Sequence, residues 1–391
     1  MSRESDQAQR TGAKACIILP YLNEYRAEFL RLTMEELATR GIALDVRVGS
    51  PGAEGRGRGD AVTDSGVKQL RQVRLRLARQ EALLRVPDLS ALKANLLILE
   101  QATRNLESYC FTLRRAVSAH QKLAFWGHGH TITEPQSSRQ ASAQTWMLRH
   151  ADWFFAYTAG SARRATSRGM PASRATVLNN TFDGADLRQR VESLSSEEVQ
   201  SARARWGVNI NADAGLFIGG LDETKRLDFL VEAGAEVRRR NSQFILLIGG
   251  SGPSATIDRL TKAGPWVKYL GRLGAHEKAL AARVAKAILM PGRVGLVAID
   301  SFALGLPLIT TDWEWHAPEF EYLTAKNSVV LADDRNAYAE GVAKLFVDEE
   351  RRIALSRGAW ESLDQYPLEG MVQRFSDGVE KALATPPRRD K

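Results

Sequence analysis

This chain of 391 residues contains only two cysteines, Cys16 and Cys110, which lie far apart in the sequence. Two thiols are too few for a disulfide framework or a thiolate metal site, so we interpret both as reduced structural side chains. The sequence also lacks any run of about 18 apolar residues, and residues 1–14 are polar and charged. Neither a membrane-spanning helix nor a signal peptide is therefore expected, and we predict a cytoplasmic protein.

Three common catalytic and phosphate-binding patterns are absent as well. The sequence contains no G-K-[ST] phosphate loop, no Gly-x-Ser-x-Gly nucleophile turn and no C-x-x-C pair. What is present is typical of a globular protein: 44% of the residues are hydrophobic, and the length is enough for two domains with separate cores.

Charge is distributed unevenly between the two halves. Residues 1–190 hold 28 Lys and Arg against 18 Asp and Glu, a net +10, whereas residues 191–391 hold 26 against 28, a net −2. A basic half favours an anionic partner, such as lipid head groups, a lipid-diphosphate acceptor or nucleic acid. We interpret its densest part, Lys68 to Arg85, as an amphipathic basic helix that is either a solvated outer face or a contact with an anionic membrane. Because no aromatic residue is interleaved there, no nucleic-acid binding is expected.

Strand and helix patterns alternate along the whole chain. In the first half the predicted strands are residues 15–19, 44–48, 123–126, 153–158 and 175–178. The predicted helices are residues 25–40, 68–85, 89–120, 141–150 and 161–168. In the second half the predicted strands are residues 214–218, 244–248, 267–270, 287–290, 308–311 and 328–331. The predicted helices there are residues 197–206, 227–239 and 278–285, followed by two C-terminal helices.

Such repeated alternation predicts an α/β protein with two facing Rossmann-like, doubly wound domains and a ligand in the cleft between them. We expect a disordered tail over 1–14 and an N-terminal domain over 15–190. A C-terminal domain should follow over 191–360, and a C-terminal helix that crosses back, with a basic tail, over 361–391.

The segment from Pro291 to Asp312 predicts a loop, a short helix, a second loop and a strand. Gly292 and Gly295 lie in the first loop, where backbone N–H groups at the start of the helix can approach a diphosphate. A helix N-terminus attracts such an anion through its unpaired donors and its dipole. Asp300, one turn into the helix, can accept hydrogen bonds from ribose hydroxyls. The pattern therefore predicts a nucleotide-sugar site.

This segment resembles the donor-site signature of the retaining family-4 glycosyltransferases, E-G-F-G-L-P-x-x-E-A-x-A-x-G-x-P, with Gly295, Leu296, Gly305 and Pro307 in register. The resemblance covers residues 151–331. Further stretches similar to family motifs occur in the family's order, at residues 151–183, 217–233, 247–253 and 267–273. The resemblance implies the GT-B fold, in which the N-terminal domain faces the acceptor and the C-terminal domain binds the nucleotide sugar.

The resemblance also implies roles for individual residues. Lys225 matches the lysine that pairs with the donor diphosphate, and His128 matches a histidine that faces the reacting end of the sugar, so these two are the expected catalytic residues. The donor is expected to contact Gly219, Gly220, Lys225, Gly250, Tyr269, Leu270, Gly271, Arg272, Gly295, Leu296, Val297 and Asp300. Further candidates are His130, Glu319 and Glu321. His128 and His130 form a His-x-His pair, but no third metal ligand lies near them in sequence, and we expect no metal.

The implied function is metal-independent, cofactor-free transfer of a sugar from a nucleoside diphosphate sugar to a hydroxyl of a glycan, lipid-linked or small-molecule acceptor. The chain departs from the family at the first glutamate, which falls on Gly292, and at the arginine, which falls on Gly220. Arg226, Arg272 and Arg293 are candidates to replace that arginine. These departures leave open a catalytically inactive binding or scaffold protein and, third, an epimerase or phosphorylase. The donor base, the sugar, the acceptor and peripheral contact with the inner face of the membrane stay open too.

Overall fold

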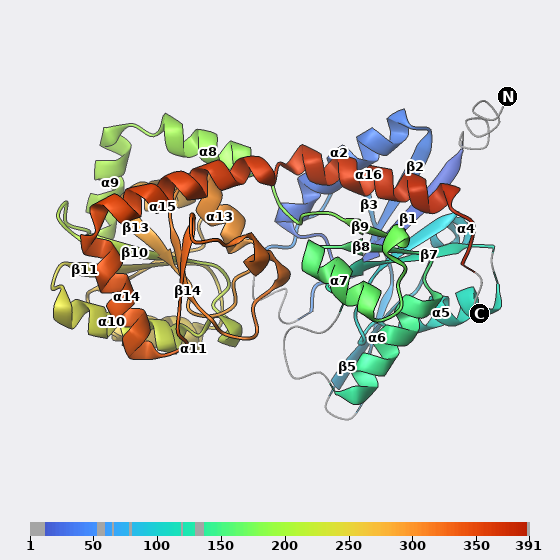
Figure 1. Ribbon diagram of the computed structural model, residues 1–391, viewed down its shortest axis with the longest axis horizontal. Helices are drawn as coiled ribbons and strands as arrows, with labels where there is room; N and C mark the ends of the chain where they lie inside the picture. Colours follow the sequence, from blue (N-terminus) through green and yellow to red (C-terminus); the bar gives the residue numbers. More distant parts are fainter. Residues whose placement is uncertain are drawn as a thin grey trace. The chain divides into compact units, whose positions relative to one another are not determined.

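The computed structural model describes residues 12–52, 59–64, 66–77, 80–118, 120–129 and 137–388. These residues form two compact units (Figure 1). The first unit takes its described residues from 12–180, apart from Gly59, and from 368–388, and the second is Thr181–Pro367 together with Gly59. The chain thus leaves the first unit, completes the second and returns with its last helix.

The first unit is built on a parallel sheet. Its strands are β1 Ala13–Leu19, β2 Ile42–Val48, β3 Val67–Gln69, β6 Leu96–Glu100, β7 Lys122–Gly127, β8 Trp153–Ala156 and β9 Ala175–Val177. Their order is β3-β2-β1-β6-β7-β8-β9, and every neighbouring pair is parallel. The direction of winding changes between β1 and β6, which is the topological switch point where doubly wound sheets bind ligands.

Helices cover both faces of this sheet, and its central strands accordingly contain continuous apolar runs, as in Cys16-Ile-Ile-Leu19 and Leu96-Leu-Ile-Leu99. They are α2 Glu24–Thr39, α4 Leu89–Lys93, α5 Leu106–Val117, α6 Ser138–His150, α7 Ala159–Ser167 and α16 Leu368–Ala384. The last, α16, packs beside α2 and buries Phe375 against Phe29, Trp126 and Phe155. Among the described residues, no helix is both long enough and apolar enough to cross a membrane.

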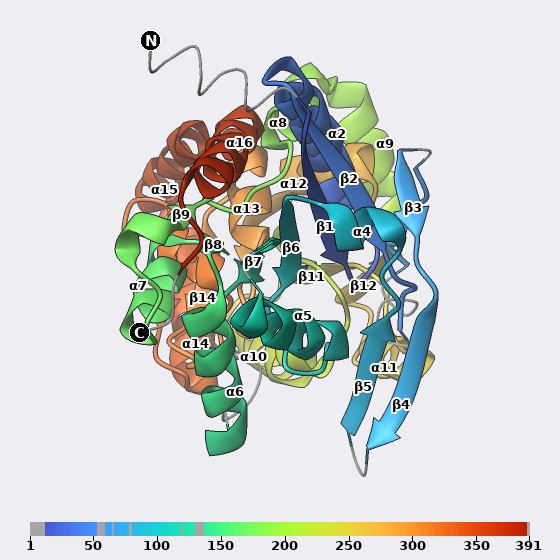
Figure 2. The ribbon, with the colours of Figure 1, turned by 90° about the vertical axis from the view of Figure 1, so that its right-hand side faces the viewer.

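The predicted basic helix over Lys68–Arg85 is wrong. After β3, residues Gln72–Leu77 and Gln80–Arg85 form the antiparallel hairpin β4–β5, whose two strands lie side by side in Figure 2. Apolar residues recur there at every second position, as Val73, Leu75 and Leu77 do, and this is the period of a strand. The hypothesis that a basic helix over Lys68–Arg85 contacts a membrane is therefore not supported, because these residues do not form a helix.

The predicted helical stretch over 89–120 is also wrong, because it contains the strand β6. Its apolar run, Leu96-Leu-Ile-Leu99, is too short for its periodicity to separate a buried strand from a buried helix. In the sheet, β6 pairs with β1 on one side and β7 on the other. The sequence prediction thus missed the strand that forms one side of the switch point.

The second unit repeats the architecture. Its strands are β10 Asp213–Ile218, β11 Phe244–Gly249, β12 Val267–Gly271, β13 Ala285–Leu289, β14 Leu308–Thr311 and β15 Ser328–Leu331, in the order β12-β11-β10-β13-β14-β15. Every neighbouring pair is parallel, and the switch point lies between β10 and β13. The helices are α8 Gly184–Ser193, α9 Ser196–Trp206, α10 Leu227–Arg240, α11 Ser254–Lys262, α12 Ala275–Val284, α13 Val297–Leu304, α14 Arg335–Val347 and α15 Glu349–Ser362. The prediction of two doubly wound α/β domains is confirmed.

The bounds of the units differ from those expected. The first unit ends at Asn180 instead of 190, because α8 packs on α12 and α13, and Gly184 lies against the side chain of Leu363. Strand β1 begins at Ala13, inside the expected tail. Residues 361–367 lie in the second unit, whereas α16 lies in the first.

Candidate functional site

In the second unit, two loops leave the carboxyl ends of the strands that flank the switch point. One follows β10 and contains Gly219, Gly220 and the short 3-10 helix η2, Glu223–Lys225. The other follows β13 and contains residues 291–296, which lead into α13. Parallel strands present their carboxyl ends at one edge of a sheet, so both loops lie where such folds bind ligands.

Backbone contact between Gly219 and Gly250 shapes the first loop. Gly250 has a φ of +154°, and a Cβ atom built on it would overlap the carbonyl oxygen of Gly219. Gly219 itself has a φ of +152°. Only glycine readily adopts such positive φ angles, and at Gly250 any side chain would overlap the carbonyl oxygen of Gly219. The two glycines therefore allow the backbones at the ends of β10 and β11 to lie in contact. Gly220, where the family has its arginine, has only the Asp222 carboxylate near its missing side chain.

The second loop is packed directly on Lys225. A Cβ atom at Gly292 would come within 2.5 Å of the Lys225 carbonyl carbon, and the amide of Arg293 donates to the carbonyl oxygen of Thr224 at 2.9 Å. The Lys225 Nζ atom in turn donates to the carbonyl oxygen of Arg293 at 2.6 Å. Position 292 therefore requires a glycine for steric reasons, since any side chain there would push the loop away from Lys225.

His316 holds the same loop in place through hydrogen bonds, a role that we did not predict from the sequence. Its Nδ1 atom accepts the amide hydrogen of Val294 at 3.1 Å, and its Nε2 atom lies 2.9 Å from the carbonyl oxygen of Thr311. The two bonds require a neutral ring protonated on Nε2. Burial and, to a lesser extent, the positive charges of Lys225 and Arg293 together lower the pKa of His316 from 6.5 to about 4. The ring also stacks on Phe320, with 4.1 Å between centroids.

Helix α13 places its N-terminus just after this loop. The amides of Ala298, Ile299 and Asp300 are bonded to backbone oxygens within the turn, whereas those of Leu296 and Val297 make no hydrogen bond in the described structure. Unpaired amides at a helix N-terminus are donors for a phosphate. The structure thus puts the predicted residues Leu296 and Val297 beside the loop that Lys225 contacts.

Asp300 is buried one turn into α13, and its Oδ1 atom accepts a hydrogen bond from Lys278 Nζ at 2.7 Å. Sequence analysis missed this lysine because it lies on α12, 22 residues earlier in the chain. The Oδ2 atom makes no hydrogen bond in the described structure. One carboxylate oxygen therefore holds Lys278, and the other has no partner among the described residues.

The predicted base-binding residues lie at the end of β12. Tyr269 donates through its hydroxyl to the carbonyl oxygen of Gly250 at 3.0 Å, which fixes its ring beside the first loop. Leu270 is half-buried, Arg272 is exposed, and Gly271 has a φ of +76° with open space around it. The open space at Gly271 is compatible with the close approach of a base that was predicted there.

Of the arginines considered as replacements for the family arginine, Arg226 is used structurally. Its guanidinium donates to the carbonyl oxygen of Pro291 at 3.4 Å, pairs with Asp333 and lies over the ring of Phe229. Arg293 remains a candidate to replace the family arginine. It lies in the loop at residues 291–296, and its positive charge lowers the pKa of His316, which contacts this loop. Glu319 is buried, and its Oε2 atom is 3.8 Å from where a Cβ atom of Gly295 would stand.

In the first unit, His128 follows β7, as expected. Its ring stacks on that of Tyr157, with 4.4 Å between centroids, and its carbonyl oxygen accepts from Arg164. His130 lies outside the described residues. Among the described residues, no group of three or more His, Cys, Asp and Glu side chains could hold a metal ion.

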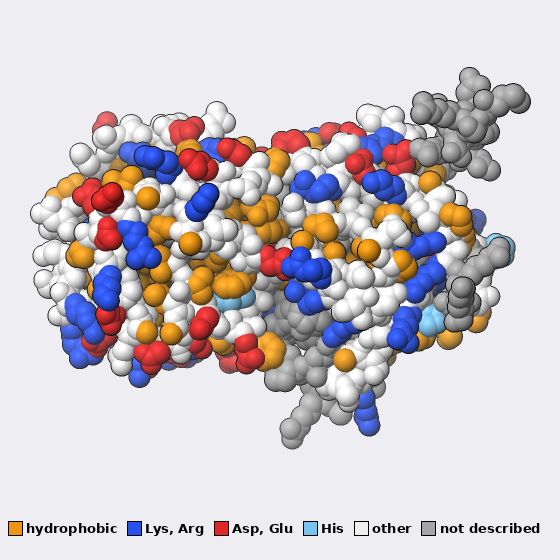
Figure 3. Space-filling model, viewed as in Figure 1, with side chains coloured by type: hydrophobic (Ala, Val, Ile, Leu, Met, Phe, Trp, Pro, Cys, Tyr) orange, Lys and Arg blue, Asp and Glu red, His pale blue; other side chains and the backbone are white. Residues whose placement is uncertain are grey.

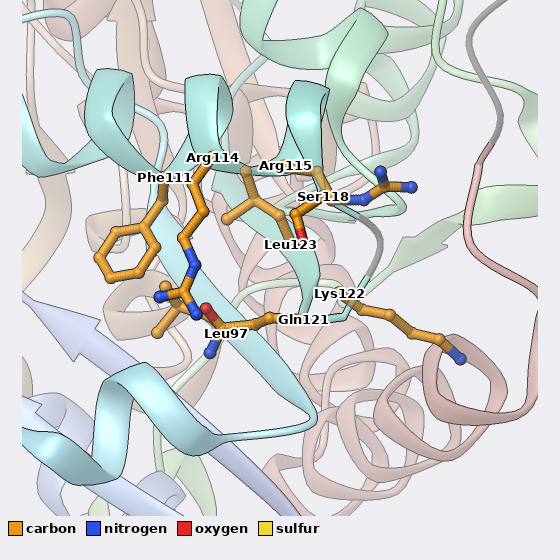
Figure 4. A pocket seen from close by; sticks show the side chains of 8 residues that line it. All are labelled: Leu97, Phe111, Arg114, Arg115, Ser118, Gln121, Lys122 and Leu123. Atoms are coloured by element: carbon orange, nitrogen blue, oxygen red, sulfur yellow. The ribbon is translucent and has the colours of Figure 1, made fainter.

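A small cavity of about 10 Å³ lies elsewhere in this unit, lined by Leu97, Phe111, Arg114, Arg115, Ser118, Gln121, Lys122 and Leu123 (Figure 4). This volume holds about one water molecule. Lys122 and Leu123 begin β7 and Leu97 lies near the start of β6, so the cavity is at the amino edge of the sheet, away from the switch point. We therefore exclude it as a substrate site.

Comparison with known proteins agrees with this geometry. Residues 213–348 match the family model for group 1 glycosyl transferases. No curated protein matches the sequence.

Among solved structures, the chain is similar to a glycosyltransferase from Rickettsia africae, with a TM-score of 0.68, 12% identity and coverage of 95% of this chain and 98% of that one. It is also similar to Anabaena Alr3699/HepE in complex with UDP, with a TM-score of 0.65, 14% identity and coverage of 94% and 99%. A third is sucrose-phosphate synthase from Thermosynechococcus elongatus, with a TM-score of 0.67, 15% identity and coverage of 93% and 98%. At such identities the likeness shows the fold, and the family match adds the class of domain. The chain therefore has the GT-B fold, and its residues 213–348 match the model for group 1 glycosyl transferases.

Proposed function

We propose that this protein is a retaining glycosyltransferase that moves a sugar from a nucleoside diphosphate sugar to an acceptor hydroxyl. The observation that carries the proposal is the meeting of Lys225 with the loop before α13, at the switch point between β10 and β13. A lysine and unpaired helix amides at one point supply positive charge to a diphosphate without a metal ion. Anabaena Alr3699/HepE, which shares the fold, was solved with UDP, so uridine is the first base to test.

In this mechanism the chain acts by electrostatics on the leaving group. Lys225 Nζ and the amides of Leu296 and Val297 stabilise the negative charge that develops on the diphosphate, a contribution of about 3–4 kcal/mol for each well-placed donor. Asp300 holds the ribose through its second oxygen. The retaining outcome rests on the family resemblance, with the acceptor hydroxyl attacking the same face of the sugar and passing its proton to the leaving phosphate.

Calorimetric titration of UDP, GDP, TDP and ADP, each without and with magnesium, tests the donor site. We expect one nucleotide to bind, and Lys225→Ala to weaken its binding about tenfold or more, because a charge-assisted hydrogen bond is lost. Asp300→Ala should weaken nucleotide binding too, but have little effect on inorganic pyrophosphate. Lys262→Ala, which removes an exposed lysine at the end of α11 in the same unit, is the matched control.

The outcomes separate the transferase from the catalytically inactive scaffold protein. Binding of one nucleotide, together with release of the diphosphate from its sugar conjugate that falls about 100-fold or more in Lys225→Ala, supports a transferase. Binding without turnover in any acceptor mixture favours the scaffold function. Unchanged nucleotide binding and turnover in Lys225→Ala would contradict the role given to this lysine.

A further inference from the structure

Arg26 differs from the other buried arginines of the first unit. Arg47, Arg85 and Arg115 each form an ion pair with an aspartate or a glutamate. Arg26 is only 7% exposed, yet no carboxylate of the described structure lies within ion-pair distance of it. Because a buried charge is costly unless it is paired, the missing anion needs an explanation.

The contacts that Arg26 does make are all neutral. Its Nη2 atom donates to the hydroxyl oxygen of Tyr157 at 2.5 Å, and the guanidinium lies 4.8 Å from the ring centroid of Trp126. Its Nε atom is buried without a partner, and Nη1 makes no hydrogen bond in the described structure. Burial lowers the pKa of Arg26, but Tyr157, Tyr25 and, without a hydrogen bond, Glu100 raise it, and the net shift is upward. An aromatic ring and a hydroxyl orient the guanidinium but do not neutralise it.

Arg26 also stands at the switch point of its sheet. It lies in the first turn of α2, directly after β1, and Asn23 precedes this helix. Asn23 occupies the N-cap position, but its side chain makes no capping bond, and its Oδ1 atom is buried without a partner. On the other side of the switch point, Gln101 follows β6 and has a buried Nε2 atom without a partner. Figure 2 shows β1 and β6 side by side.

These three side chains are each more than nine-tenths buried and together offer complementary chemistry. The guanidinium of Arg26 and the amide nitrogen of Gln101 donate to oxygen atoms, and a charged donor favours an anionic oxygen. The amide oxygen of Asn23 accepts from a hydroxyl. Native proteins leave few such groups unsatisfied, and clustering at a switch point indicates a ligand.

We propose that Asn23, Arg26 and Gln101 form the binding site for an acceptor that carries a phosphate or carboxylate group as well as hydroxyls. This inference rests on the proposed transferase function, because it names the substrate class on the acceptor side. Arg26 is bonded to Tyr157, whose ring stacks on His128. The anionic group is thus held one side chain away from the histidine predicted to face the reacting sugar. Sugar phosphates, sugar acids and phosphate-bearing lipid head groups share this chemistry.

The test is calorimetric titration of glucose 6-phosphate, glucuronic acid and uncharged glucose, with flotation of phosphatidic acid and phosphatidylcholine vesicles as the lipid arm. We expect an anionic probe to bind and glucose to bind at least about tenfold more weakly. Arg26→Gln should abolish this preference for the anion. Arg31→Gln is the matched control, since Arg31 lies on the same helix, carries the same charge and pairs with Glu28 and Glu35 at the surface.

Binding of a soluble anion that is lost in Arg26→Gln and kept in Arg31→Gln supports a free acceptor. The same result with phosphatidic acid vesicles only supports a lipid-linked one. Equal affinity for glucose and glucose 6-phosphate, binding of no anionic probe, or anion binding that survives Arg26→Gln overturns the proposal. If Arg26→Gln unfolds the first unit, Arg26→Lys and Gln101→Leu decide by the same criteria.

Nucleotide binding in the second unit separates this inference from the proposed function. UDP titration is expected to be unchanged in Arg26→Gln, because none of the three residues belongs to that unit. If no nucleotide binds to the wild type while the anion preference depends on Arg26, the transferase proposal fails and the anion site stands. If a nucleotide binds but no anion preference exists, only the anion site is wrong.

Discussion

At the scale of single residues, the most constrained side chain that contacts the loop at residues 291–296 is His316. Both of its ring nitrogens are used, one by the amide of Val294 and one by the carbonyl oxygen of Thr311. A proton on Nδ1 would break the bond to Val294 and place a positive charge beside Lys225 and Arg293. Burial and these two cations together lower the pKa of His316 to about 4, so the ring is neutral at physiological pH.

This pKa predicts an acid-sensitive donor domain. The unfolded chain binds a proton at His316 near pH 6.5 and the folded chain only near pH 4, so the stabilisation is complete above pH 6.5 and is lost as the pH falls to 4. The loss should reach about 3 kcal/mol. In His316→Gln, unfolding of the second unit followed by urea titration at several pH values should show a shallower decline over this range.

The matched control is His276→Gln, which removes an exposed histidine of α12 in the same unit. It should leave the pH profile of unfolding as in the wild type. An equally steep decline in His316→Gln would show that the histidine is not the group that titrates.

Residue patterns predicted part of the donor site and missed what depends on contacts distant in sequence. Lys225, Leu296 and Asp300 could be found because their spacing follows a strand or opens a helix. Lys278, which holds Asp300, could not, because the packing of α12 on α13 brings the two together. Gly292 looked like a lost glutamate, whereas its reason is steric, namely the Thr224–Lys225 backbone against its Cα atom.

At the scale of helices and strands, elements whose residue pattern fits one period were predicted well, and elements whose pattern fits both a helix and a strand were not. Strand β14, Leu308–Thr311, has the predicted bounds, and the bounds of α2 differ from the prediction by one residue at each end. The hairpin β4–β5 was predicted as a basic helix from its interleaved arginines and apolar residues. Its apolar residues in fact alternate with the period of a strand. Strand β6 was missed because its run of four aliphatic residues, Leu96-Leu-Ile-Leu99, fits a buried helix as well as a buried strand.

Helix α16 predicts a strong dependence of the first unit on a distant part of the chain. Phe375 is fully buried between Phe29, Trp126 and Phe155, with ring centroids 4.6–5.6 Å away. Phe375→Ala should therefore destabilise the first unit by about 3–5 kcal/mol, measured by urea unfolding. Lys381→Ala, at an exposed position of the same helix, should change stability by less than about 0.5 kcal/mol. Similar losses in both variants would contradict the packing of α16.

At the scale of the whole molecule, charge and connectivity divide the chain in the same place. The net +10 lies in residues 1–190, most of the first unit, and in the second unit basic and acidic side chains are interspersed over the face in view (Figure 3). Arginines such as Arg47, Arg85 and Arg115 form buried ion pairs with aspartate or glutamate side chains. Each such pair also buries an acidic side chain, so these pairs leave the net charge of the first unit unchanged.

Connectivity leads to the last prediction. Apart from Gly59, the second unit is one continuous segment, Thr181–Pro367, with its own core, whereas the first unit is complete only when residues 368–384 return to it. A chain that ends after Pro367 should unfold its first unit, because Leu368, Met371, Phe375 and Val379 no longer fill that core. Its second unit should stay folded and bind the same nucleotide as the full chain. Calorimetry should then show one unfolding transition, raised in temperature by the nucleotide, since ligands stabilise only the unit that binds them. Two retained transitions would mean that the first unit folds without α16, and loss of nucleotide binding would mean that the second unit depends on the first.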